Sequence, residues 1–168
     1  MPTRAYLSLG SNVGDRAASL KHAISRLGAL GDVVAVSSFY ETEPVEVTSQ
    51  PWFLNCAVAL DTGLTAEGLL VGILGVEQEM GRRRIAKKGP RNIDIDILLL
   101  GDEVISVAAL DVPHPAMHLR RFVLEPLVEI APTALHPVLK RSVRELRDAL
   151  PRGEQAVRVV AILKGGRS

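Results

Sequence analysis

Apolar and polar residues alternate with two different periods along the first 100 residues, and these periods predict six elements of secondary structure. Alternation at every second position indicates strands, whereas apolar residues spaced three and four apart indicate helices. Turn residues and helix caps mark the boundaries between them. The predicted order is strand 4–10, helix 15–27, strand 33–40, strand 53–60, helix 66–80 and strand 93–100.

The order strand, helix, strand, strand, helix, strand is that of the ferredoxin-like β-α-β-β-α-β core. We therefore expect an α+β fold in which an antiparallel sheet carries helices on one face. Residues 10–15 are expected to form a turn and residues 41–51 an exposed loop. Beyond residue 100 the pattern is less regular, and we expect additions to the core. They are a return strand at 103–107, a helix at 117–130 that contains Pro126, a helix at 142–150 and a strand at 157–163.

Length and composition favour one soluble globular domain. The chain has 168 residues, of which 47% are hydrophobic and 23% charged, and a domain of this size buries about 70% of its unfolded surface. We expect the domain to span residues 1–164 and to be followed by a frayed tail. A net charge of +1 argues against a general nucleic-acid binder. The N-terminus lacks the layout of a signal peptide and no apolar run approaches 18 residues, so we expect a cytoplasmic protein with neither a membrane nor an obligate protein partner.

Two aspartates stand two positions apart in the last strand of the predicted core. Asp94 and Asp96 alternate with isoleucines, so both carboxylates project from one face, roughly 6.5–7 Å apart along the backbone. Adjacent carboxylates repel one another unless a cation lies between them. Magnesium is usually held by one or two carboxylates together with substrate phosphates. The alternative is a solvent-facing strand, although aspartate is depleted in strands.

The ten residues from 82 to 91 carry six positive charges and no negative one. Arginine binds phosphate oxygens with two hydrogen bonds at once, and several cations together neutralise the charge of a transferring phosphoryl group. A charge run of this kind is otherwise usually a solvated surface. This run, however, is confined between Gly81 and Gly89–Pro90, and such a loop can close over a ligand. Next to the aspartate pair, it indicates a nucleotide–magnesium site.

Two further groups of residues are candidates for ligand binding. His114 lies between two prolines and is therefore rigidly placed, so it could bind a phosphate or a ribose unless its role is structural. Arg120 and Arg121 begin a predicted helix, where cations oppose the helix dipole, and a nearby anion would explain them.

A third group is suited to a flat heterocyclic ring. The Asn55 amide offers a donor and an acceptor together, as the edge of such a ring requires. Phe53 and Phe122 could enclose the ring, although a place in the core is the alternative for both. Cys56 has apolar neighbours and is expected to be a buried, inert thiol.

These motifs, in this order, closely resemble those of the 6-hydroxymethyl-7,8-dihydropterin pyrophosphokinase family. The resemblance covers roughly residues 4 to 140, and its most specific block is Gly-Pro-Arg-Asn-Ile-Asp-Ile-Asp at 89–96. Supporting motifs lie at 10–12, 38–42, 53–55, 112–114, 120–122 and 129–132. The chain departs from the family pattern in several places. Its basic loop is shorter and has no tryptophan just before Gly89, and Lys88 stands where an arginine is common. Phe53 replaces a tyrosine, and Pro115 follows His114 where an aromatic residue is often found.

The resemblance implies an ATP-dependent diphosphokinase of folate biosynthesis. Such an enzyme moves the terminal pyrophosphate of ATP to the hydroxymethyl oxygen of the pterin and releases AMP. ATP would be the co-substrate, and two magnesium ions would bridge its phosphates. The metal ligands would be Asp94 and Asp96, which with Arg82 and Arg91 would form the catalytic set. The nucleotide would contact Glu77, Arg82, Arg84, Lys88, Arg91, Ile97, His114 and Arg120. The pterin pocket would be formed by Thr42, Pro44, Val45, Phe53, Asn55 and Phe122.

Two other functions stay open when the residues are considered alone. A ferredoxin-like regulatory module would bind a nucleotide without turning it over, and it would need no paired carboxylates. A nucleotidyl transferase would use the same acidic pair to move AMP and release pyrophosphate. The products of the reaction distinguish these possibilities.

Overall fold

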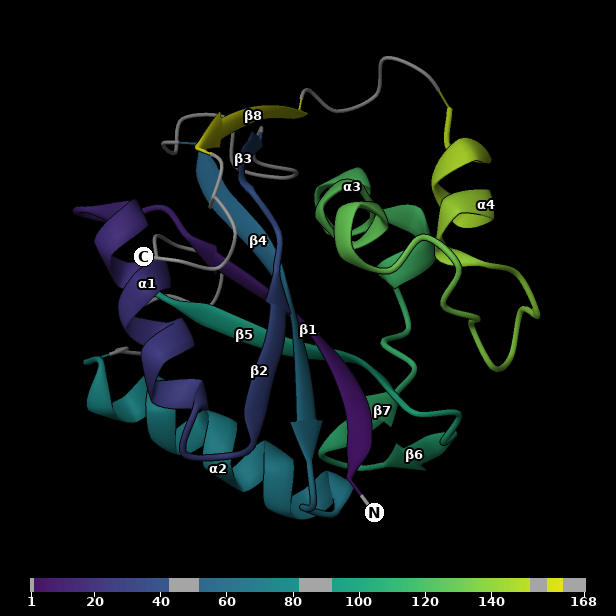
Figure 1. Cartoon of the computed structure of the whole chain (residues 1–168), viewed down its shortest axis with the longest axis horizontal. Coiled ribbons are helices and arrows are strands. Elements are labelled where there is room, and N and C mark those ends of the chain that lie inside the picture. The colour runs from purple at the N-terminus through teal and green to yellow at the C-terminus, as the bar shows by residue number, and fades with distance from the viewer. Residues whose placement is uncertain (1, 43–51, 82–91, 152–156, 162–168) are drawn as a thin grey trace.

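The computed structural model describes residues 2–42, 52–81, 92–151 and 157–161. Six antiparallel strands form one sheet in the order β5–β1–β4–β3–β8, and β2 also pairs with β4 (Figure 1). The strands β1 (Thr3–Ser11) and β4 (Phe53–Thr62) pair along their whole length. On its other side β1 pairs with β5 (Asp94–Leu100). The predicted ferredoxin-like order and α+β class are confirmed.

Helices α1 (Arg16–Leu27) and α2 (Ala66–Glu79) cover one side of the sheet, the α1–α2 face (Figure 1). Each begins at its predicted cap, because side-chain oxygens of Asp15 and Thr65 each accept a backbone N–H at 3.1 Å. Alternate residues of β1, β4 and β5 point toward these helices and form the first core. The strand residues in it are Ala5, Leu7, Leu9, Leu54, Cys56, Val58, Leu60, Ile95, Ile97 and Leu100.

Helices α3 (Arg121–Ile130) and α4 (Val143–Asp148) lie on the opposite side of the sheet, the α3 face (Figure 1). A second, smaller core joins them to the strands. Its buried members are Ala57, Leu98, Leu99, Met117, Val123, Leu124, Leu127, Ala131, Val143 and Leu146. The two core helices α1 and α2 share one face as expected, and the added helices α3 and α4 lie on the other side.

The strand expected at 33–40 is in fact two strands, β2 (Asp32–Val36) and β3 (Phe39–Thr42). The hydroxyl of Ser37 accepts the Ala57 N–H at 2.8 Å and donates to the Ser38 carbonyl at 2.7 Å. A serine hydroxyl bound to nearby backbone competes with the regular ladder of a sheet, which explains the interruption. β3 pairs with β4 on one side and with β8 (Val157–Ala161) on the other.

Two boundaries near the predicted loops also differ. Gly10 and Ser11 continue β1 instead of forming a turn, because they pair with residues of β4. Glu41 and Thr42 belong to β3, so the segment expected as a loop begins later than predicted. Residues 43–51 of that segment lie outside the described residues.

The region after β5 contains a hairpin that the sequence pattern did not predict. The short strand β6 (Ile105–Val107) pairs with β7 (Leu110–Val112) and not with β5. The helix predicted at 117–130 is a single 3-10 turn, η1 (Met117–Leu119), followed by α3. Arg120 separates them with an extended backbone, φ −118° and ψ 110°. Charged and apolar residues continue without a break across this point, so periodicity alone could not locate it.

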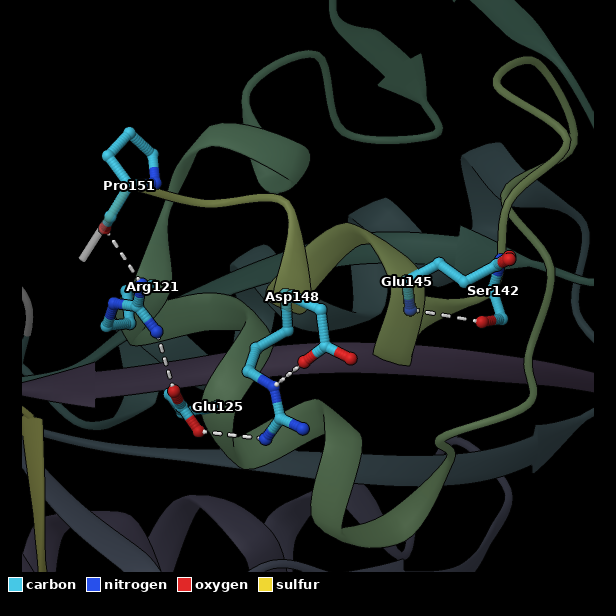
Figure 2. A network of polar contacts seen from close by, with 7 residues as sticks. Arg121, Glu125, Ser142, Glu145, Asp148 and Pro151 are labelled. Atoms are coloured by element: carbon cyan, nitrogen blue, oxygen red, sulfur yellow. Dashed lines mark hydrogen bonds and ion pairs between the residues drawn. The ribbon is translucent and has the colours of Figure 1, made fainter.

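A network of charged side chains joins α3 to α4 (Figure 2). The Glu125 carboxylate accepts hydrogen bonds from Arg121 at 2.9 Å and from Arg147 at 3.3 Å, and Arg121 also donates to the Pro151 carbonyl at 3.0 Å. A capping box begins α4, with Ser142 and the Glu145 three residues later bonded to each other's backbone N–H. Arg121 is therefore a structural cation of the helix pair.

No helix within the described parts of the chain is long and apolar enough to span a membrane. The predicted tail at 165–168 and the last two residues of the predicted final strand lie outside the described residues.

Candidate active site

A row of residues in register crosses the α3 face near one end of the sheet. Asp94 of β5 pairs with Gly10 of β1, Gly10 pairs with Asn55 of β4, and Asn55 pairs with Tyr40 of β3. We call these four residues the cross-strand row. Neighbouring strands are 4.7–4.9 Å apart, so Asp94 and Asn55 stand about 10 Å apart across Gly10. The register thus brings the predicted phosphate side and the predicted ring side onto one surface.

Gly10, at the centre of this row, makes room for the Asn55 side chain. A Cβ atom at Gly10 would lie 2.6 Å from Asn55 Oδ1 and 3.6 Å from Phe53 Cδ1. The Asn55 side chain therefore lies over the glycine, and its Nδ2 donates a hydrogen bond to Thr42 Oγ1. Asn55 and Thr42 are both buried. The fold holds this amide in one place, as recognition of a ring edge requires.

Asp94 and Asp96 lie on the α3 face, and both are half-buried. The backbone between them is held by Glu77 of α2, whose Oε2 accepts the Ile95 N–H at 2.8 Å. Glu77 is 5% exposed, so its carboxylate is built into the fold behind the aspartates. Its position fixes the segment of β5 from which the two aspartates project.

The donor set fits magnesium. Two carboxylates on one strand face offer the hard oxygen ligands that this ion prefers, and magnesium completes its shell with water and substrate phosphates. Within the described residues, no three His, Cys, Asp or Glu side chains gather into a metal site. A magnesium site that uses two protein carboxylates does not need a third such ligand.

His114 lies close enough to Asp94 and Arg120 for their charges to act on it. Burial, and next the positive charge of Arg120, lower the pKa of His114, while Asp111 and Asp94 act in the opposite direction. Its Nδ1 accepts the Ala116 N–H at 3.1 Å, and its own backbone N–H donates to the Leu98 carbonyl at 2.9 Å. With Nδ1 as acceptor, the neutral ring carries its proton on Nε2. His114 therefore presents an N–H donor that can bind an anion.

Arg120 and Phe122 come from the start of α3. The Arg120 guanidinium lies over the Phe122 ring, 5.5 Å from its centroid, and this contact orients the cation. Apart from the family resemblance, nothing in the residue pattern separates Arg120 from Arg121. The structure does, because Glu125 engages Arg121 and not Arg120.

Glu129 of α3 anchors the strand that carries Tyr40 and Thr42. Its carboxylate accepts three kinds of hydrogen bond: from the Ser38 N–H at 3.0 Å, from the Ser38 hydroxyl at 2.9 Å and from the Tyr40 hydroxyl at 2.7 Å. Burial and the bond to Glu129 raise the pKa of Tyr40. Sequence reasoning noted Glu129 only as part of a family motif and did not assign it this contact, because the partners are about 90 residues apart.

Ile97 and Cys56 lie on the α1–α2 face, away from the aspartates. Ile97 is 5% exposed and belongs to the first core, so a contact with a nucleotide would be made by its backbone. Cys56 is buried in the same core, as predicted, and burial raises the pKa of its thiol. The predicted site residues that lie outside the described residues are Pro44, Val45, Arg82, Arg84, Lys88 and Arg91.

Comparisons with known proteins agree with this architecture. The profile of the 7,8-dihydro-6-hydroxymethylpterin-pyrophosphokinase (HPPK) family matches residues 6–132. A 2-amino-4-hydroxy-6-hydroxymethyldihydropteridine pyrophosphokinase of Methylorubrum extorquens is 51% identical over 132 residues, which are 77% of this chain and 84% of the relative. The folic acid synthesis protein fol1 of Schizosaccharomyces pombe is 41% identical over 149 residues, 88% of this chain and 20% of that protein.

A solved structure shows the same fold. The crystal structure of wild-type Plasmodium falciparum HPPK-DHPS with pteroate has a TM-score of 0.71 at 17% identity, and the match covers 88% of this chain and 44% of the solved one. The chain thus spans less than half of that longer protein. Fold and sequence define a transferase of the kinase type. The chain belongs to the HPPK family, and the prediction of an ATP-dependent pyrophosphokinase of folate biosynthesis is confirmed.

Proposed function

We propose that this protein transfers the terminal pyrophosphate of ATP to the hydroxymethyl oxygen of 6-hydroxymethyl-7,8-dihydropterin and releases AMP. The observation that carries this proposal is the cross-strand row. It sets a paired-carboxylate site and a fixed carboxamide on one face, on strands about 10 Å apart, with Gly10 between them making room for the Asn55 amide. A triphosphate at one end and a pterin at the other would meet above Gly10.

The nucleotide side is formed by β5 and by the residues around η1. Asp94 and Asp96 would hold two magnesium ions, which would supply positive charge to the phosphates. The His114 Nε2–H and the guanidinium of Arg120 would bind phosphate or ribose oxygens of the same ligand. Glu77 supports this side from behind by fixing the Ile95 N–H. Arg82, Arg84, Lys88 and Arg91 are proposed phosphate ligands from the sequence alone.

The pterin side is formed by β3, β4 and the start of α3. Asn55 would bind the edge of the ring, with its amide oriented by Thr42. Phe53, beside Gly10, and Phe122, under Arg120, would pack against the ring faces. Pro44 and Val45 complete the proposed pocket from the sequence alone.

The proposed reaction is an in-line displacement at the β-phosphorus of ATP. The hydroxymethyl oxygen forms a bond to this phosphorus as the bond to the bridging α,β oxygen breaks, and AMP leaves with the electron pair. The hydroxyl proton departs to solvent or phosphate. Catalysis of this kind depends mainly on positioning and on charge neutralisation. The Asn55–Thr42 pair would position the pterin. The proposed magnesium ions and Arg120 would neutralise the charge of the phosphates.

Product analysis tests the proposal directly. Purified protein is incubated with ATP, magnesium and 6-hydroxymethyl-7,8-dihydropterin, and the products are identified by phosphorus NMR and chromatography. We expect one AMP for each pterin diphosphate formed. Free pyrophosphate together with an AMP-linked pterin would indicate nucleotidyl transfer instead. ATP binding without any product would indicate a regulatory module.

A further inference from the structure

Arg16 bridges two strands at the end of the sheet that carries the proposed pterin pocket. Its guanidinium forms an ion pair with Glu41 of β3 at 2.9 Å, and another of its nitrogens donates to the Trp52 carbonyl at 2.8 Å. Glu41 is the second-last residue of β3, and Trp52 comes directly before β4. One side chain of α1 therefore links the end of β3 to the residue that precedes β4.

The position of Arg16 in its helix is itself informative. It is the first residue of α1, directly after the Asp15 cap, and a cation there opposes the helix dipole. The side chains of Arg16 and Glu41 are only 27% and 15% exposed, so the pair is shielded from solvent more than an ordinary surface ion pair. Because a cation is unfavourable for the helix at this position, the ion pair of Arg16 with Glu41 suggests a specific role for Arg16.

The strands that Arg16 joins share a short ladder, which the Asn55–Thr42 hydrogen bond also supports. β3 and β4 share only three residue pairs, and the last of these is Thr42 with Phe53. Ten residues, 43–52, connect them along the chain. A ladder of three pairs opens at its end at a small cost in hydrogen bonds. Arg16 adds a side-chain link between the two strands at this end.

The bridge and the proposed pocket lie on opposite faces of the same strands. Alternate residues of β3 point to opposite sides: Glu41 faces α1, whereas Thr42 bonds to Asn55 on the α3 face. Thr42 follows Glu41 directly, and Phe53 follows Trp52 directly. Arg16 therefore fixes the backbone of both proposed pterin residues while standing on the other side of the sheet from them.

We propose that Arg16 is a positioning residue for pterin binding, which acts by clamping the open end of the β3–β4 ladder. The proposal rests on the proposed function for its ligand, but the clamp itself does not depend on a ligand. Loss of the clamp should let Thr42 and Phe53 fluctuate and so weaken the ring site. The nucleotide side, which is built from β5 and η1, should keep its affinity.

The test compares Arg16→Gln with Arg26→Gln. Arg26 also lies on α1 and forms an ion pair with Glu79 of α2, remote from the pocket, so its substitution measures the general effect of losing a helix ion pair. For Arg16→Gln we expect about tenfold weaker binding of 6-hydroxymethyl-7,8-dihydropterin, equivalent to about 1.4 kcal/mol. Binding of an ATP analogue should change less than about twofold. Arg26→Gln should change neither.

Two further measurements separate the clamp from general damage and from failure of the proposed function. In the free protein, Arg16→Gln should speed amide hydrogen exchange at 40–42 and 53–55 but not in β5. Glu41→Gln should do the same, and combining the two substitutions should add little to either. Unchanged exchange at these strand ends, or equal loss of pterin and nucleotide affinity, would overturn the proposal. If wild-type protein does not bind the pterin while the exchange result holds, the clamp stands and the proposed function fails.

Discussion

The two faces of the sheet use the same strands for different purposes. On the α1–α2 face, alternate residues are apolar from Ala5 to Leu9 in β1, from Leu54 to Leu60 in β4 and from Ile95 to Leu100 in β5, and one continuous core covers them. On the α3 face, apolar residues such as Ala57 and Leu98 serve the second core, but Asp94, Gly10 and Asn55 stand beyond it. Because successive residues of a strand point to opposite faces, the same strands can form a core on one face and a site on the other. The proposed site lies where the second core ends, while the other face holds the strands in place.

The largest expected effect comes from removing a carboxylate from the α3 face. Asp96→Ala should abolish turnover and leave pterin binding largely intact, because the proposed metal ligand is lost while the ring side is built from other strands. Steady-state kinetics and pterin titration measure the two quantities. Retention of more than about a tenth of wild-type turnover, a change of only about 1.4 kcal/mol in the barrier, would contradict the metal role.

The contrasting control lies on the opposite face of the same sheet. Leu7 is fully buried in the first core, and Leu7→Ala should lower the free energy of unfolding by about 2–5 kcal/mol. The turnover of the folded fraction should stay close to that of the wild type. Urea unfolding of both variants completes the comparison, since Asp96→Ala should retain most of the stability that Leu7→Ala loses. An equal loss of stability in both would mean that the two faces are not separable.

The sequence predicted most of this division, for a physical reason. Period-two alternation depends on neighbours in the chain, so the apolar face and the Asp94–Asp96 pair can be found without a structure. Register cannot be found in this way, and neither can contacts between distant residues. The pairing of Gly10 with both Asp94 and Asn55, and the contact of Glu129 with Ser38, therefore came only from the fold.

Local features that leave the apolar pattern unchanged explain the misplaced boundaries. The Ser37 hydroxyl interrupts a strand by bonding to backbone groups, and the extended backbone of Arg120 interrupts a helix. Arg16 did leave a signal, namely a cation at the first position of a helix. The same signal drew attention to Arg120 and Arg121, but for Arg121 the anion proved to be Glu125 of its own helix.

A smaller effect, on pterin affinity, is expected from adding a side chain at Gly10. In Gly10→Ala the new Cβ would meet Asn55 Oδ1 at 2.6 Å, closer than real Cβ contacts, so the amide that Thr42 holds in place must move. We expect pterin affinity to fall about tenfold, or about 1.4 kcal/mol, with little change in nucleotide affinity. Gly63→Ala is the matched control, because no atom lies within 4 Å of a Cβ there. Titration of both ligands decides the point, and an unchanged pterin affinity would show that Asn55 need not occupy this position.

The smallest expected effect is a change of folding stability with pH that depends on His136. His136 is buried, and its Nδ1 accepts the N–H groups of Val138 at 3.2 Å and Leu139 at 3.0 Å. Burial, and next the charge of His118, lower the pKa of His136. Protonation would turn this acceptor into a donor that faces two other donors. The unfolded chain therefore takes up the proton more readily than the folded protein.

The sign of the pH dependence follows from this difference. The contribution of His136 to stability is fully present above the unfolded pKa of about 6.5 and is lost as the pH falls through the lower folded pKa. Urea unfolding at about pH 7.5 and about pH 5.5 should show a loss in the wild type. His136→Asn, whose Oδ1 can accept the same N–H groups without titrating, should reduce that loss. His114 has a lowered pKa as well, so part of the loss should persist in the variant. A loss of the same size in the wild type and His136→Asn would place the acid sensitivity at groups other than His136.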